Sequence, residues 1–245
     1  MTQMPAPSRR QLMALALAEA LGLPARGAQA APLVPLFVGT GPPSDQTPQM
    51  LAWMAQQANL GWDYRPTPWL RAQKLTAAGE GVMFGLTRTP QRDKVLRFSL
   101  PIWSNYTWVI VREGDQAHIR RYGDLNGQVV CWARGSSYGE LFTNAGLGQM
   151  DPREASDDDG ALRMAAAGRC RAALITLESE HPDRAAQHPA LADMRKRGLA
   201  LVPHVMTHTP LHFATGLNSR WTWVIDRINE VAARSHGELQ RMRQG

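Results

Sequence analysis

Apolar runs and helix-like apolar patterns alternate along most of the chain. Residues 33–38 form a short apolar run that ends in a Gly- and Pro-rich loop, which predicts a buried strand followed by a turn. Residues 49–60 instead place their apolar side chains at helical spacing. The same criteria predict further strands at 81–86, 106–111, 128–133 and 171–177, and further helices at 69–78, 138–144, 161–167 and 218–234. This alternation predicts the α/β class with mainly parallel sheets, in two series separated near residues 112–114.

Composition indicates one large or two small packed domains. The chain has 245 residues, of which 44% are hydrophobic and 20% are charged, so it can bury a core. The formal net charge is +6, but the densest basic cluster is residues 195–197, so we expect no nucleic-acid binding. A mild positive excess suits anionic small molecules or membrane surfaces. No apolar run reaches the ~18 residues of a transmembrane helix.

The first thirty residues have the pattern of an export signal. Ser8-Arg9-Arg10 is followed by a mostly apolar stretch over 12–23 and by Ala28-Gln29-Ala30, which predicts cleavage after Ala30. The paired arginines resemble a twin-arginine signal, in which Glu19 within the apolar stretch is better tolerated. The alternative is an amphipathic N-terminal helix that stays attached. Because no cysteine lies near the cleavage point, we expect a periplasmic protein without a lipid anchor.

Neither a metal nor a cofactor is expected. The loop at 39–44 contains two prolines and lacks the third glycine of a dinucleotide loop. His204, His208 and His212 recur every four residues, but the prolines and β-branched residues around them favour an extended segment. Residues four apart in a strand lie ~13 Å from each other, which no single metal ion spans. The two cysteines, Cys131 and Cys170, form either a disulfide or two buried thiols.

Three interpretations fit the segment Gly135-Ser136-Ser137-Tyr138-Gly139. It fits the G-x-S-x-G elbow of serine hydrolases, between a predicted strand and a predicted helix, with Ser137 as the nucleophile. Asp183 or Asp193, followed by one of the three histidines, gives the chain order of a catalytic triad. The same turn also binds anions without chemistry, through free backbone N–H groups and hydroxyls at a helix N-terminus. The third interpretation is a capped helix with Ser136 or Ser137 as N-cap.

Two further stretches resemble the signature of bacterial extracellular solute-binding proteins of family 3, the periplasmic receptors of amino-acid ABC importers. Thr87-Arg88-Thr89-Pro90-Gln91-Arg92-Asp93 and Leu96-Arg97-Phe98-Ser99-Leu100-Pro101 match that family's Ser/Thr-x-Thr-x-x-Arg and Phe-Ser-x-Pro segments. Residues 124–130 with the Gly135 turn resemble the start of its second lobe, and residues 171–174 resemble its later strand. The resemblance extends from about Leu33 to the end of the chain.

This resemblance implies a two-lobed periplasmic-binding-protein-like (type II) fold that closes over a small carboxylate-bearing solute. Lobe 1 would comprise 31–112 plus 209–245, and lobe 2 would comprise 113–208. The Arg92 guanidinium would fork onto the solute carboxylate, which Thr87 shares. Ser136 and Ser137 would complete the anion site from the other lobe. The implied partner is an ABC permease or a membrane sensor, and we expect a monomer without enzymatic activity or cofactor.

The chain departs from the family where the solute's ammonium group would bind. The family's Asp after the later strand corresponds to Thr176, with Glu178 two residues on, and two further family positions fall at Gly41 and near Ser44. An ammonium without a carboxylate partner is costly in a closed cleft, so the solute need not be an ordinary α-amino acid. Large aromatic residues either supply a different pocket or fill the core. The aromatic residues are Trp69, Trp103, Tyr106 and Trp132, and Arg71 is a further candidate for such a pocket. A degenerate pair of lobes that binds a protein partner is a further alternative.

Overall fold

The structure is a computed structural model that describes residues 31–41, 46–138 and 150–244. The predicted export signal, Ser44 and the predicted helix beyond Tyr138 lie outside the described residues. The strands are β1 (Leu33–Val38), β2 (Gly61–Pro66), β3 (Val82–Leu86), β4 (Leu96–Phe98), β5 (Trp103–Arg112), β6 (Val129–Ala133), β7 (Asp151–Ala155), β8 (Ala172–Leu177), β9 (Leu199–Leu201) and β10 (Thr207–Gly216). The helices are α2 (Gln46–Gln57), α3 (Trp69–Ala77), α4 (Pro90–Asp93), α5 (Asp158–Ala166), α6 (Pro182–Ala186), α7 (Thr222–Arg234) and α8 (His236–Gln244).

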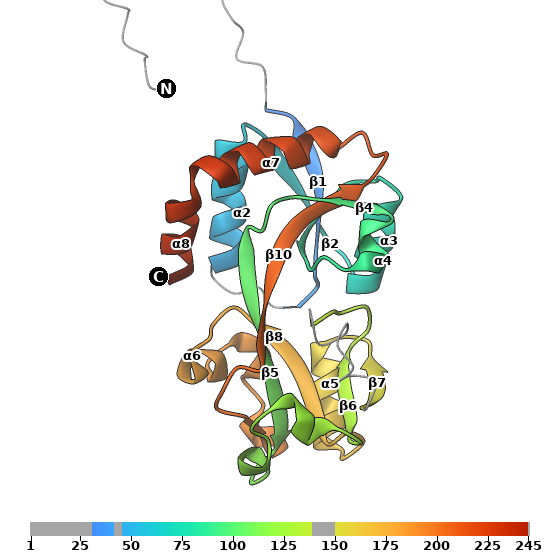
Figure 1. Ribbon diagram of the computed structural model, residues 1–245, viewed down its shortest axis with the longest axis vertical. Helices are drawn as coiled ribbons and strands as arrows, with labels where there is room; N and C mark the ends of the chain where they lie inside the picture. Colours follow the sequence, from blue (N-terminus) through green and yellow to red (C-terminus); the bar gives the residue numbers. More distant parts are fainter. Residues whose placement is uncertain (1–30, 42–45, 139–149, 245) are drawn as a thin grey trace, which may run out of the picture. The chain divides into compact units, whose positions relative to one another are not determined.

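The strands form two parallel groups that are joined by two long antiparallel strands. The strand order is β2-β1-β3-β10-β5-β8-β6-β7, with β4 paired to β10 and β9 to β5. In the first lobe β1 is parallel to β2 and β3, and in the second lobe β6 is parallel to β7 and β8. Strands β5 and β10 pair with each other and run from one lobe into the other (Figure 1). The predicted two-lobed α/β fold is therefore confirmed.

The sheet of the first lobe is buried on both faces. Leu36 faces a core shared with α2, α7 and α8, whereas its neighbour Phe37 faces a second core shared with α3. The apolar stripe of α7 explains why this helix packs on the sheet, because Val224, Ile225 and Ile228 are fully buried. A strand that is buried on both faces has a continuous apolar sequence, and residues 33–38 have such a sequence.

The second lobe is built in the same way. Trp108 and Ile110 on β5 face α5 and α6, whereas Val109 and Val111 face the other side of the sheet, toward Tyr138. Helix α5 begins after Asp157, whose side chain accepts a hydrogen bond from the Gly160 backbone N–H (2.7 Å), an ordinary N-cap. The parallel strands β6 and β8 both end on the side of the first lobe, which brings the turns after them toward it (Figure 1).

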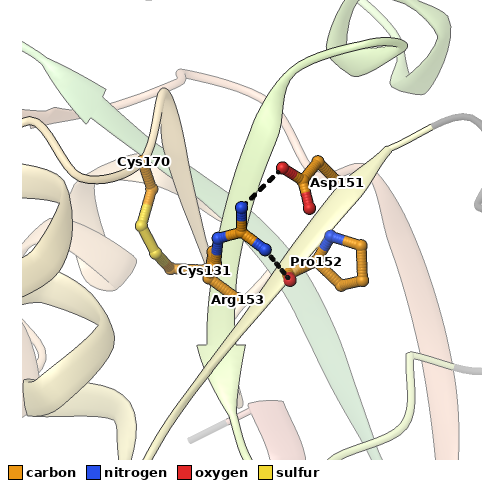
Figure 2. The surroundings of a disulfide bond; sticks show 5 residues. All are labelled: Cys131, Asp151, Pro152, Arg153 and Cys170. Atoms are coloured by element: carbon orange, nitrogen blue, oxygen red, sulfur yellow. Dashed lines mark hydrogen bonds and ion pairs between the residues drawn. A yellow bond between two sulfur atoms is a disulfide. The ribbon is translucent and has the colours of Figure 1, made fainter.

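A disulfide joins Cys131 on β6 to Cys170, just before β8. Their Cα atoms lie 5.9 Å apart, within the normal range for a disulfide. Figure 2 shows the bond beside Arg153 of the edge strand β7, whose guanidinium turns along the strand to the Asp151 carboxylate (2.9 Å). The structure thus favours a disulfide over two separate thiols.

Most of the predicted elements are confirmed, and the strands that were missed are informative. The sequence pattern did not predict β2 or β7, which are the two edges of the sheet. Strand β7 is charged and mostly exposed, so it lacks the alternation that marks a half-buried strand. In β2, aromatic and charged residues do alternate over 62–65, but the run is short and ends at Pro66. The histidine segment is extended as predicted for His208 and His212, which lie in β10, whereas His204 precedes that strand.

Candidate functional site

The Thr87–Asp93 motif folds into a single turn that presents Arg92. Thr87 follows β3 and is buried, and Thr89 caps the short helix α4 by accepting a hydrogen bond from the Arg92 backbone N–H (3.2 Å). Pro90 occupies the first turn, where its missing N–H costs nothing. The Arg92 guanidinium turns back and donates from Nη1 to the Thr87 carbonyl (2.7 Å). The motif therefore fixes the direction of the guanidinium.

Arg92 reaches from the first lobe to the second. Its Nη2 donates to the carbonyl of Gly135 (2.8 Å), in the turn that follows β6. Among the described residues no carboxylate forms an ion pair with Arg92, and both of its acceptors are neutral carbonyls. Burial therefore lowers the pKa of Arg92 to about 10. Arg92 is therefore a partly buried cation whose acceptors among the described residues carry no net charge.

The Gly135 turn places Ser136 and Ser137 directly after the carbonyl that Arg92 contacts. The Ser136 N–H donates to the Ala133 carbonyl (3.1 Å), which closes the turn. The Ser137 hydroxyl is buried and has no hydrogen-bond partner in the described part of the chain. Tyr138 ties the end of this turn to β8, because its buried hydroxyl donates to the Leu174 carbonyl (3.1 Å). Buried hydroxyls normally have a partner, so with respect to the described residues Ser137 retains unused hydrogen-bonding capacity.

Helix α3 contributes a second contact to the same carbonyl. The Gln73 side-chain amide donates from Nε2 to the Gly135 carbonyl (2.9 Å). Trp69, one helical turn earlier, lies over two glycines of the first lobe: a Cβ at Gly85 or Gly39 would sit 3.3 Å or 3.8 Å from its ring. Trp69 packs against the core on the α3 side of the sheet, as a core residue would.

A carboxylate lies at the end of β8, but not at Thr176. Thr176 is within β8, opposite Thr107 of β5. In the described ranges no hydrogen bond joins Thr176 to Arg92, Ser136 or Ser137, so these predicted site residues are not brought into one hydrogen-bonded group. Glu178 instead accepts a hydrogen bond from Thr47 at the start of α2, and so contacts the opposite lobe.

The histidines required by the hydrolase alternative lie elsewhere. His212 is buried in the first lobe, where its Nδ1 lies 2.8 Å from the Ser99 carbonyl oxygen. His204 and His208 line a separate open depression of about 440 Å³ with Tyr106 and Glu180. Within the described residues no histidine is hydrogen-bonded to Ser137, and no cluster of three His, Cys, Asp or Glu side chains is suited to a metal ion. None of the described histidines is therefore positioned as a base for the elbow.

Sequence reasoning missed Gln73, Thr47 and the Gly135 carbonyl. Gln73 and Gly135 are 62 residues apart, and Thr47 and Glu178 are 131 apart, so no local pattern connects them. The glycine itself was a usable signal. Gly135 has φ +78°, a left-handed conformation that other residues rarely adopt.

No helix in the described ranges is long and apolar enough to cross a lipid bilayer.

No protein-family model and no curated protein sequence matches the chain. Solved structures do match it. A histidine kinase sensor domain with similarity to periplasmic binding proteins has a TM-score of 0.69 at 19% identity, covering 88% of this chain and 96% of that domain.

Two further structures give the same result. An ancestral arginine-binding protein bound to arginine has a TM-score of 0.69 at 16% identity, covering 88% of this chain and 98% of that one. The VFT2 domain of Bordetella pertussis BvgS, a double mutant, has a TM-score of 0.67 at 18% identity, covering 98% and 99%. The resemblance to family 3 solute-binding proteins is thus confirmed at the level of the fold, and the chain has the two-lobed α/β fold of periplasmic binding proteins.

Proposed function

We propose that this protein binds a small carboxylate-bearing solute between its two lobes, with Arg92 as the carboxylate anchor. One observation carries the proposal: Arg92 is partly buried at the junction of the lobes and its acceptors are two neutral carbonyls. Thr87 would share the carboxylate from the first lobe, and Ser136 and Ser137 from the second. Trp69 would form an apolar wall beside them.

The charge of Arg92 favours a carboxylate over a neutral ligand. Burial has cost the guanidinium part of its hydration, and carbonyl oxygens supply hydrogen bonds but no net negative charge. A carboxylate would supply both, in the planar geometry that the guanidinium fork matches. Charge-assisted hydrogen bonds of this kind contribute ~1.5–3 kcal/mol each, so a few give micromolar binding.

The other end of the site favours an organic anion without an α-ammonium group. Thr176 replaces the Asp that holds the ammonium in family members, and the nearby Glu178 carboxylate accepts a hydrogen bond from Thr47. An amino acid would require Glu178 to give up this contact. A dicarboxylate or a sulfonate would not, so these classes come first in a ligand search.

The proposed setting is the periplasm. Residues 1–30 would be removed on export, and the two lobes would be 31–112 plus 209–245 and 113–208, hinged where β5 and β10 cross. The partner would be an ABC permease or a membrane sensor. The similarity to a histidine kinase sensor domain and to a BvgS domain supports the sensor. We propose a monomer that binds without catalysing a reaction.

A thermal-shift screen tests this proposal. The purified protein is heated with dicarboxylates, sulfonates, amino acids and short peptides. A ligand at ~100 times its Kd stabilises the fold by ~2.7 kcal/mol, which raises Tm by about 5–10 °C for a chain of this size. We expect such a shift with at least one carboxylate. A flat screen on folded protein would contradict the proposed function and direct attention to protein partners and to esterase assays on Ser137.

A further inference from the structure

Side-chain hydrogen bonds between described residues join the two lobes directly. Arg92 and Gln73 of the first lobe both donate to the Gly135 carbonyl of the second, at 2.8 Å and 2.9 Å. Thr47 of the first lobe donates to the Glu178 carboxylate of the second. The lobes are therefore linked at two separate points, after β6 and after β8.

The Gly135 carbonyl is well suited to be a docking point. A carbonyl oxygen has two lone pairs, and here they accept one donor from α3 and one from the Arg92 turn. The approach is close: a Cβ at Gly135 would lie 3.1 Å from Gln73 Nε2 and 3.2 Å from Leu70 Cδ1. With φ +78°, the position is also strained for any residue other than glycine.

The second link joins a carboxylate to a hydroxyl in the first turn of a helix. Glu178 follows β8, and Thr47 lies in the first turn of α2, a helix of twelve residues. A carboxylate beside a helix N-terminus is stabilised by the free N–H groups and the partial positive charge there. The hydroxyl of Thr47 adds a hydrogen bond to a charged acceptor, which is stronger than one between neutral groups.

One of these links uses Arg92, the group that the proposed function assigns to the solute carboxylate. We propose that Gln73 and Thr47 are positioning residues that hold the lobes closed on each other, with the Gly135 carbonyl occupying the acceptor place of a solute carboxylate on Arg92. This inference rests on the proposed function for the role of Arg92. Its consequence is that a solute enters by displacing Gly135, so the change that a sensor partner reads is an opening or a rearrangement of closed lobes.

The distance between the lobes tests the inference without a ligand. Both native cysteines are in the disulfide, so spin labels can be placed on Gln56→Cys and Arg195→Cys, exposed positions on α2 and in the second lobe. Pulsed dipolar spectroscopy is then recorded in carboxylate-free buffer. We expect one narrow distance distribution for the otherwise unchanged chain, and a broader, longer one for Thr47→Val/Gln73→Ala.

Two variants make the result decisive. Lys74→Ala changes the exposed neighbour of Gln73 and should keep the narrow distribution. Gly135→Ala should broaden it by a different route, through the clash with Gln73 and Leu70. Circular dichroism confirms that each variant is folded. The inference is wrong if the unchanged chain already has the broad distribution, or if Thr47→Val/Gln73→Ala stays narrow. A flat ligand screen with a narrow distance would remove the proposed function and leave this link intact.

Discussion

A guanidinium that is buried loses hydration, and hydrogen bonds or a negative charge must replace it. At Arg92 hydrogen bonds replace part of the lost hydration, but no negative charge among the described residues does. The Thr87 and Gly135 carbonyls accept its hydrogen bonds, while burial lowers its pKa to about 10. The motif of residues 87–93 predicted the identity of this residue. It did not predict the Gly135 contact, because Gly135 lies 43 residues away and is positioned by β6. Local sequence thus indicated the chemical group but not its partner.

Asp158 is the clearest titrating carboxyl at the residue scale. It opens α5 next to the N-cap Asp157, and burial together with the Asp157 charge raises its pKa from 3.8 to about 6. A carboxyl with a raised pKa stabilises the fold at low pH, and that contribution is lost as the pH rises from about 4 through about 6. We expect Asp158→Asn to be more stable than the unchanged chain at pH 7.5, by at most about 2–3 kcal/mol, and equally stable near pH 4.

Urea unfolding at several pH values measures this difference directly. Asp157→Asn is the matched control, because Asn keeps the N-cap acceptor and removes only the neighbouring charge, so its effect at pH 7.5 should be smaller. Parallel pH profiles for Asp158→Asn and the unchanged chain would refute the assignment.

At the scale of elements, predictability follows burial. Strand β1 and helix α7 bury one or two faces completely, and their apolar patterns predicted them within a few residues. The edge strands β2 and β7 were not predicted, because β7 is charged and mostly exposed and β2 has only a short alternation over 62–65 that ends at Pro66. Strand β10 was read as an extended segment up to His212, whereas it continues to Gly216 by pairing with β3 and β4, partners distant in sequence.

The disulfide between β6 and the segment before β8 should stabilise the second lobe. It closes a loop across a sequence separation of 39 residues, for which chain-entropy arguments give about 4 kcal/mol. We expect Cys131→Ala/Cys170→Ala to lower Tm by roughly 10 °C in calorimetry. Dithiothreitol should lower Tm of the unchanged chain toward that value and leave the variant unaffected. A Tm that is indifferent to reductant would show that the bond contributes nothing in solution.

At the scale of the whole molecule, two strands determine the arrangement of the lobes. β5 and β10 pair over residues 103–107 and 207–211, and each has one end in each lobe. Periodicity predicted two series of strands and helices, but neither the pairing of these strands nor the late return of the chain to the first lobe. The family resemblance supplied the return of the chain, through lobe 1 as 31–112 plus 209–245, but not the pairing of the two strands. The contacts between Gln73 and Gly135 and between Thr47 and Glu178 depend on that return, so they are visible only in three dimensions.

The central claim, that Arg92 anchors a solute carboxylate, is tested most directly by calorimetric titration of two arginine variants. The titrant is the carboxylate with the largest thermal shift. Arg88→Ala is the matched control, because Arg88 belongs to the same motif but is exposed and paired with Asp93 (3.0 Å). We expect Arg92→Ala to weaken binding about 10- to 150-fold, the loss of ~1.5–3 kcal/mol, and Arg88→Ala to bind like the unchanged chain. Unchanged affinity in Arg92→Ala, or an equal loss in both variants, would contradict the account.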